Sequence, residues 1–160
     1  MSKDIQHMQL AKAVADIYSK DRSTKVGCVF IGKYNEVLSI GYNGFVRGVD
    51  DNEDSRHERP EKYFWSEHSE RNAIFNAARI GISLKDASVY ITSLPPCVDC
   101  ARSLVQVGVK RIILEQKAFN NERTDFWSKE WGKISSMFKE TKIEVVILDE
   151  EKRKSENETT

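Results

Sequence analysis

The 160-residue sequence contains only three cysteines and three prolines, and it carries no net charge. One cysteine would be left over from any pairing, so metal or thiol chemistry is favoured over a disulfide framework. Acidic and basic residues balance at 25 each, which argues against a broad nucleic-acid groove and leaves only a local basic patch. We therefore expect no nucleic-acid partner.

Long apolar segments are absent from the sequence as well. No run of apolar residues approaches the roughly 20 that a membrane-spanning helix needs. The first twenty residues lack the apolar centre of a secretion signal. The composition, 39% hydrophobic and 31% charged, is ordinary for a globular protein, and the length suits one domain with a real core. We expect a cytoplasmic protein with no membrane partner.

The hydrophobic patterns predict alternating helices and strands. The expected order is a helix over 4–19, a hairpin of strands 26–31 and 37–42, a helix over 66–80, a strand over 88–93, a helix over 97–108, a strand over 110–114, a helix over 125–139 and a strand over 142–148. Strands that alternate with helices need crossover connections, so the sheet should be mostly parallel, with one antiparallel edge from the hairpin. The predicted fold class is α/β, a three-layer α/β/α sandwich around a five-stranded mixed sheet.

Two stretches fall outside this pattern. Residues 43–62 form a long, polar and charged loop, and such a loop inside a compact domain is usually functional or mobile. Residues 149–160 are too polar to pack, so we expect a disordered tail there and a folded domain over residues 1–148.

Histidine and cysteine residues at two expected helix starts predict a metal site. Ser66 is expected to cap the 66–80 helix, which places His68 and Glu70 in its first turn. Cys97 and Cys100 lie three apart at the start of the next helix, so both sulfurs point the same way and the helix N-terminus favours their thiolate forms. Two thiolates and one imidazole leave the fourth position of a catalytic zinc for water. Glu70 can take a proton from that water, whose pKa zinc lowers toward about 7, and pass it to a leaving nitrogen.

Each of these residues also has a simpler interpretation. A Cys-x-x-Cys between a strand and a helix is typical of thioredoxin-like redox pairs as well as of metal sites. A lone histidine or glutamate near a helix start is more often a surface residue or a charge that compensates the helix dipole. The joint occurrence of His-x-Glu and Pro-Cys-x-x-Cys favours metal, because it is the signature of zinc-dependent nucleobase deaminases. A four-ligand structural zinc would need Cys28, expected to be a buried thiol, or His57, and a second metal in the 44–62 loop is a further alternative.

With these motifs, the sequence resembles the cytidine and deoxycytidylate deaminase superfamily, and most closely its deoxycytidylate (dCMP) deaminases. The resemblance covers residues 19–113 and rests on four segments, SKDRSTKVGCVFI, GYNGFVRGVDD, EHSERNAIFNAARIG and PPCVDCARSLVQVGVKRII. It implies a fold of the cytidine deaminase type. It also implies that His68, Cys97 and Cys100 bind Zn²⁺ and that Glu70 is the proton shuttle.

The resemblance extends to contacts with a nucleotide substrate. By position, Asn43 would contact the sugar or phosphate, and the backbone at Ser69, where the family usually has alanine, would face the pyrimidine carbonyl. Lys25 and Arg47 are candidates for the 5′-phosphate, and solvated surface positions suit them equally. Many members carry an aromatic gate after the fourth strand, for which Phe119 is a candidate, as it is for the core.

The expected activity is hydrolysis of dCMP to dUMP with release of ammonia. Substrates with the same chemistry are 5-methyl-dCMP, 5-hydroxymethyl-dCMP, CMP and free nucleosides. A tRNA adenosine deaminase shares the zinc motifs but would need a basic RNA-binding face. A non-catalytic nucleotide-binding or redox module is the alternative from another class. The resemblance further implies a homo-oligomer, with dCTP and dTTP as allosteric effectors in regulated relatives.

Overall fold

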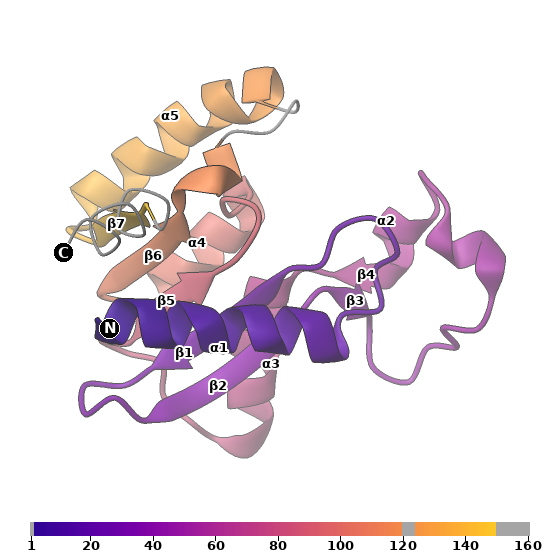
Figure 1. Ribbon diagram of the computed structural model, residues 1–160, viewed down its shortest axis with the longest axis horizontal. Helices are drawn as coiled ribbons and strands as arrows, with labels where there is room; N and C mark the ends of the chain where they lie inside the picture. The colour runs from indigo at the N-terminus through magenta and orange to yellow at the C-terminus, as the bar shows by residue number, and fades with distance from the viewer. Residues whose placement is uncertain (1, 120–123, 150–160) are drawn as a thin grey trace, which may run out of the picture.

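A five-stranded mixed sheet forms the centre of the protein (Figure 1). The computed structural model describes residues 2–119 and 124–149. The strands lie in the order β2-β1-β5-β6-β7, and their bounds are Gly27–Ile31 (β1), Val37–Tyr42 (β2), Ser88–Ile91 (β5), Arg111–Glu115 (β6) and Glu144–Leu148 (β7). The four long helices of the described part are Lys3–Tyr18 (α1), Ser69–Ile80 (α3), Val98–Gln106 (α4) and Thr124–Glu140 (α5). The predicted order of these elements is confirmed.

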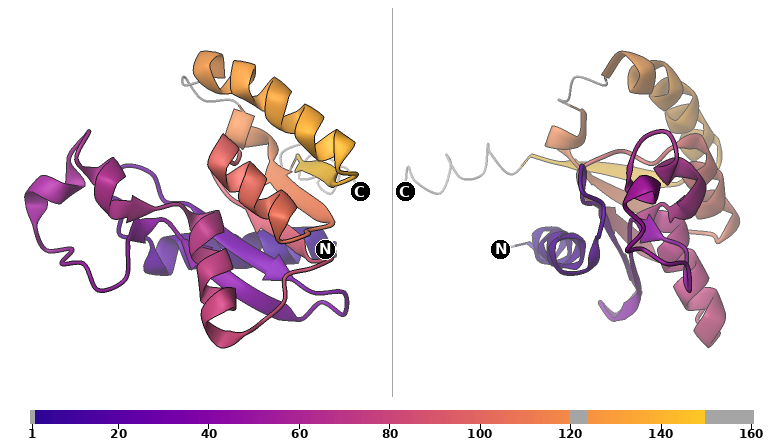
Figure 2. Two further views of the ribbon diagram at one scale, coloured as in Figure 1. Left: turned by 180° about the vertical axis from the view of Figure 1, so that it is seen from behind. Right: turned by 90° about the vertical axis from the view of Figure 1, so that its right-hand side faces the viewer.

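Helices cover both faces of the sheet, so the predicted three-layer sandwich is also confirmed (Figure 2). Helix α1 packs on one face, where Met8, Ala11 and Val14 are buried against β1 and β5. Helices α3, α4 and α5 pack on the other face, with Ala77 and Leu104 among their buried residues. Strand β1 is buried along its whole length, as expected for a strand that is covered on both sides.

The strand that runs antiparallel to the others is not at the edge of the sheet, where the prediction had placed the antiparallel strand. Strand β1 pairs antiparallel with both β2 and β5, whereas β5–β6 and β6–β7 are parallel pairs. The antiparallel strand is therefore second from the edge, and β2 forms the edge. The crossover through α3 joins β2 to β5, which run in the same direction, and it passes over β1 because the hairpin places β1 directly beside β2.

The segment predicted as a long polar loop contains short elements of its own. A two-residue strand, β3 (Gly44–Phe45), pairs with β4 (Ser66–Glu67). Between them lie the 3-10 helix η1 (Asp54–His57) and the single-turn helix α2 (Lys62–Trp65). The prediction that Ser66 caps α3 is wrong, because this residue belongs to β4 and the N-cap position falls on His68.

Two further expectations concern the chain as a whole. Residues 150–160, nearly all of the tail that we expect to be disordered, lie outside the described residues. Among the helices of the described part, none combines the length and the apolar character needed to cross a membrane.

Candidate functional site

Helix α3 lies close to the sheet because the strand beneath it has no side chain at Gly41. A Cβ atom there would lie 2.8 Å from the Cα of Ala73, and closer still to the carbonyl oxygen of Ser69. Asn72 and Asn76 then fix the helix along the edge strand, since their side-chain N–H groups donate to two carbonyls of β2 at 2.8 and 2.9 Å. These contacts place the first turn of α3 over the end of β2.

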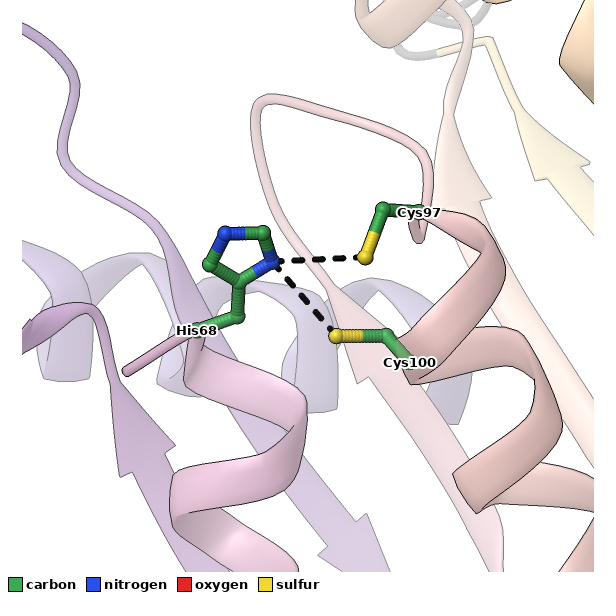
Figure 3. A group of neighbouring side chains, drawn as sticks. All are labelled: His68, Cys97 and Cys100. Atoms are coloured by element: carbon green, nitrogen blue, oxygen red, sulfur yellow. Dashed lines mark hydrogen bonds between the residues drawn. The ribbon is translucent and has the colours of Figure 1, made fainter. Parts of the chain in front are cut away.

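Three of the predicted site residues converge where α3 and α4 begin (Figure 3). His68 and Cys97 are the N-cap residues of the two helices, and Cys100 lies in the first turn of α4. Nδ1 of His68 lies 3.5 Å from Sγ of Cys97 and 3.6 Å from Sγ of Cys100. The three potential ligand atoms lie within 4.8 Å of one another.

The geometry and chemistry of this group fit zinc. Zinc bonds of about 2.0 Å to nitrogen and 2.3 Å to sulfur, at tetrahedral angles, place the two ligand atoms roughly 3.5 Å apart. The pKa of Cys97 is lowered to about 4 by hydrogen bonds with Cys100 and His68, against the effect of burial. The hydrogen bond with Cys97, together with burial, raises the pKa of the Cys100 thiol. Cys97 is therefore a thiolate before a metal binds, and Cys100 releases its proton when a metal binds.

Glu70 is buried in the first turn of α3, and it lines a cleft together with two of the candidate ligands, His68 and Cys97. Burial raises the pKa of the Glu70 carboxyl group. Hydrogen bonds from its own N–H and from the Ser69 hydroxyl, 2.9 Å away, offset part of that effect. A carboxylate with a raised pKa is suited to accept a proton and deliver it to a second atom.

The cleft has a volume of about 320 Å³, which is in the range of small-molecule sites. Its lining includes His68, Cys97 and Glu70. Its walls come from the turn before β1, from the segment that includes α2, and from Leu94 and Pro95 in the loop before α4. Ser69 also lines the cleft.

Asn43 lines the cleft as well, and its amide group organises the wall. Its Oδ1 accepts hydrogen bonds from the Val26 N–H at 2.8 Å and from the Ser19 hydroxyl at 2.6 Å. Its Nδ2 donates to the carbonyl of Thr24 at 2.7 Å. An amide nitrogen has two N–H groups, so one of them is left for a ligand in the cleft.

The two residues predicted to contact the phosphate do not line the cleft. Lys25 donates to a carbonyl of α1 at 3.1 Å, and Arg47 donates to a side chain of α3 at 2.6 Å. The basic residues that do line it are Arg59 and Lys62. The sequence analysis missed both because they belong to the long loop. Both lie within ten residues before His68, and that proximity was the available signal.

These two cations differ in their surroundings. Lys62 donates to Oδ2 of Asp21 at 2.9 Å and to the hydroxyl of Ser23 at 2.8 Å. Burial alone would raise the pKa of Asp21, but hydrogen bonds from the Thr24 backbone, Lys62 and Ser23 lower it to about 2. Arg59 is exposed and forms no ion pair within the described part of the chain. Arg59 is therefore the cation that is available to an anionic ligand.

The remaining candidates have structural surroundings. Phe119 packs on Trp131, with ring centroids 5.1 Å apart, beside the core and away from the cleft, which favours its core interpretation. Cys28 is fully buried, and burial raises its pKa, so it is an inert thiol. His57 stacks on Phe45 with ring centroids 4.7 Å apart.

A second metal receives no support from the described residues. Apart from the group at the starts of α3 and α4, no three histidine, cysteine or acidic side chains of the described ranges approach closely enough to share an ion. Neither a four-ligand structural zinc nor a metal in the 44–62 loop has the side chains it would need there.

Comparisons with known proteins agree with this site. The cytidine and deoxycytidylate deaminase zinc-binding region matches residues 1–116. A probable deoxycytidylate deaminase of Caenorhabditis elegans is 40% identical over 115 residues, which are 70% of this chain and 56% of that protein. The chain thus spans little more than half the length of this relative. An uncharacterized deaminase of Aliivibrio fischeri is 35% identical over 144 residues, 88% of this chain and 89% of the relative.

A solved structure shows the same fold. The crystal structure of a dCMP deaminase from the cyanophage S-TIM5, in complex with dCMP and dUMP, matches with a TM-score of 0.67 at 22% sequence identity. The match covers 92% of this chain and 99% of the phage protein. The family model over residues 1–116 and the extent of the sequence match show that the chain belongs to the cytidine and deoxycytidylate deaminase family, whose zinc-binding region the His–Cys–Cys group fits.

Proposed function

We propose that the protein hydrolyses the 4-amino group of dCMP, which yields dUMP and ammonia. The observation that carries this proposal is the buried Glu70 beside the candidate zinc ligands, in a cleft that Arg59 also lines. Zinc-dependent nucleobase deaminases use a zinc site with an adjacent glutamate that acts as general acid and base. An arginine without an acidic partner favours a phosphorylated nucleotide over a nucleoside, because guanidinium and phosphate form charge-assisted hydrogen bonds. The names of the worm and phage relatives support the same substrate.

In this reaction each residue of the cleft has its own role. When bound, zinc supplies an activated water by lowering the pKa of that water. Glu70 transfers two protons: it accepts one from the attacking water and delivers it to ring N3, and it accepts the second from the hydroxyl newly bonded to C4 and delivers it to the departing amine. The Ser69 hydroxyl holds the Glu70 carboxylate in one orientation. The Ser69 backbone faces the pyrimidine carbonyl, and the remaining N–H of Asn43 binds the sugar. Arg59 binds the 5′-phosphate.

Other expectations belong to the same proposal. Residues 1–148 act as one deaminase domain, and free cysteines suit a reducing compartment such as the cytoplasm. A homo-oligomer and regulation by dCTP and dTTP stay predictions from the family resemblance.

The direct test is a substrate panel with the purified, zinc-loaded protein. The loss of cytosine absorbance is followed with dCMP, CMP, deoxycytidine, 5-methyl-dCMP and 5-hydroxymethyl-dCMP, each with and without dCTP or dTTP. We expect the highest kcat/KM with dCMP. A preference for deoxycytidine would contradict the phosphate contact, and a preference for a 5-substituted nucleotide would assign that substrate instead.

A substitution of Glu70 tests the proton shuttle. Glu70→Gln keeps the shape of the side chain but cannot carry the proton, so we expect kcat to fall by roughly 10²–10⁴ while the zinc content stays unchanged. Glu144→Gln, in an exposed ion pair on β7, is the matched control and should keep full activity. A redox module would instead depend on Cys97 and Cys100 and tolerate His68→Ala, which we expect to abolish deamination.

A further inference from the structure

Glu115, the last residue of β6, is a buried carboxylate that the proposed reaction does not use. It is 2% exposed, and Glu70 is the only other charged side chain that is buried in the described part of the protein. A buried carboxylate is costly unless it is paired. Its Oε1 forms an ion pair with Nζ of Lys12 in α1 at 2.9 Å, and the exposed Lys117 lies 3.3 Å from the same oxygen.

The other oxygen of Glu115 holds a strained turn. Its Oε2 accepts a hydrogen bond from the backbone N–H of Ser93 at 3.1 Å. Ser93 has a φ of 66°, in the left-handed region that residues with a side chain rarely adopt. The Ser93 hydroxyl donates to the carbonyl of Lys25 at 3.0 Å, and the Leu94 N–H donates to the carbonyl of Thr92 at 2.7 Å. Such a conformation persists only where the surrounding structure fixes it.

The turn at Ser93 leads directly into the site. Leu94 and Pro95 line the cleft, Pro96 follows, and Cys97 is a zinc ligand (Figure 3). The two prolines restrict the backbone of this connection, because their rings fix φ. A displacement of the Ser93 backbone therefore also displaces the cleft wall and the Cys97 thiol, because the connection between them is too rigid to absorb it.

We propose that Glu115 is a positioning residue of the deaminase: its hydrogen bond to the Ser93 N–H holds the turn that presents the cleft wall and Cys97. Lys12 neutralises the carboxylate and ties it to α1. The effect on substrate binding rests on the proposed function, whereas the effect on the metal ligand does not.

Two double variants isolate the hydrogen bond from the ion pair. Glu115→Gln with Lys12→Met is neutral and keeps an acceptor for the Ser93 N–H, whereas Glu115→Leu with Lys12→Met is neutral and has none. Both carry the same change at Lys12, so any other contact of that lysine cancels. We expect the leucine variant to release zinc to a chromogenic chelator about tenfold faster than the glutamine variant, in line with the effect of outer contacts on metal ligands. We also expect a higher KM for dCMP with a smaller change in kcat. Equal zinc release by the two variants would overturn the proposal.

A matched control separates positioning from general destabilisation. Arg111, the first residue of β6, pairs with Asp4 of α1 at 3.1 Å, so this pair links the same two elements at the other end of the strand. Asp4→Asn should lower the thermal stability and leave zinc release and KM unchanged. Faster zinc release in Asp4→Asn, equal to that of the leucine variant, would mean that docking of α1 alone explains the effect, and the proposal would fail.

A shorter carboxylate keeps the test decisive if the leucine variant does not fold. Glu115→Asp retains the charge beside Lys12 but withdraws the acceptor from Ser93, so faster zinc release is expected, and unchanged release would overturn the proposal. Absence of dCMP turnover in the unmodified protein would refute the proposed substrate only, because zinc release is measured without substrate.

Discussion

Replacing Gly41 by alanine should push helix α3 away from the sheet. The new Cβ would lie 2.8 Å from the Cα of Ala73 and closer still to the carbonyl oxygen of Ser69, whereas ordinary contacts begin at 3.4 Å. Both neighbours are backbone atoms of α3, so no side chain can rotate away. The first turn of the helix must retreat by at least about 0.6 Å, the difference between these two distances.

Two consequences follow for Gly41→Ala. Overpacking of this kind costs roughly 1–3 kcal/mol, which lowers the Tm of a chain of this size by roughly 2–10 °C. His68 and Glu70 move with the helix, and a misplacement near 1 Å costs about 10²-fold in rate. We expect kcat/KM for dCMP to fall by roughly 10–100-fold, together with the decrease in Tm measured by calorimetry or circular dichroism.

The control for this prediction is Gly132→Ala in α5. A Cβ at Gly132 meets no atom within 4 Å, so alanine there should be neutral or should stabilise the helix by up to about 1 kcal/mol. Wild-type stability and activity in Gly41→Ala would refute the view that close packing of its backbone on β2 sets the position of α3.

Three further predictions concern the cleft and the metal. Arg59→Ala should raise the KM for dCMP about tenfold or more and leave the KM for deoxycytidine unchanged, as steady-state kinetics with both substrates would show, because only the nucleotide has a phosphate to lose contact. Asp21 has a pKa lowered from 3.8 to about 2, so its contribution to stability is present above about pH 4 and is lost as the pH falls toward 2. Urea unfolding should therefore show Asp21→Asn roughly 1–2 kcal/mol less stable than the unmodified protein at pH 7, with a gap that narrows toward pH 3. Cys97 is partly exposed and its pKa is lowered to about 4, so it should react with a thiol reagent in the folded protein only after zinc is chelated, giving one reactive thiol per chain, because Cys28 and Cys100 are buried.

Each of these outcomes has a contradicting result. Arg47→Ala, outside the cleft, should leave KM unchanged, and an equal rise of KM for nucleotide and nucleoside in Arg59→Ala would exclude the phosphate contact. A stability gap that stays constant from pH 7 to pH 3 would show that the Asp21 carboxylate is not the stabilising group. A second reactive thiol would show that Cys28 or Cys100 is accessible to solvent.

The metal site could be predicted from the sequence because its signals are local. The spacing of Cys97 and Cys100 at one helix start, and of His68 and Glu70 at another, fixes how each pair lies before the tertiary structure is known. The alternation of helices and strands then brings the two helix starts to the same end of the sheet. The prediction of the candidate zinc ligands therefore required little beyond the order of the elements.

The rest of the cleft depended on the path of the long loop, which local patterns do not determine. Ser66 is a good N-cap residue by type, but its pairing with Phe45 places it in a strand. The family resemblance made Lys25 a candidate for the phosphate, yet its side chain donates to a carbonyl of α1 instead. Arg59 and Lys62 reach the cleft because the loop returns over the turn before β1, a contact between segments about 40 residues apart.

The two asparagines that tie α3 to β2 have a consequence for association between copies of the protein. A strand at the border of a sheet offers its backbone to any other strand that approaches, which is the usual route to uncontrolled aggregation. Asn72 and Asn76 already occupy two carbonyl oxygens of that strand. A neighbour that added its own strand there would compete for the contacts that hold the helix carrying His68 and Glu70. Growth of the sheet at this border would therefore weaken the attachment of this helix and, with it, the position of the residues that the proposed reaction uses.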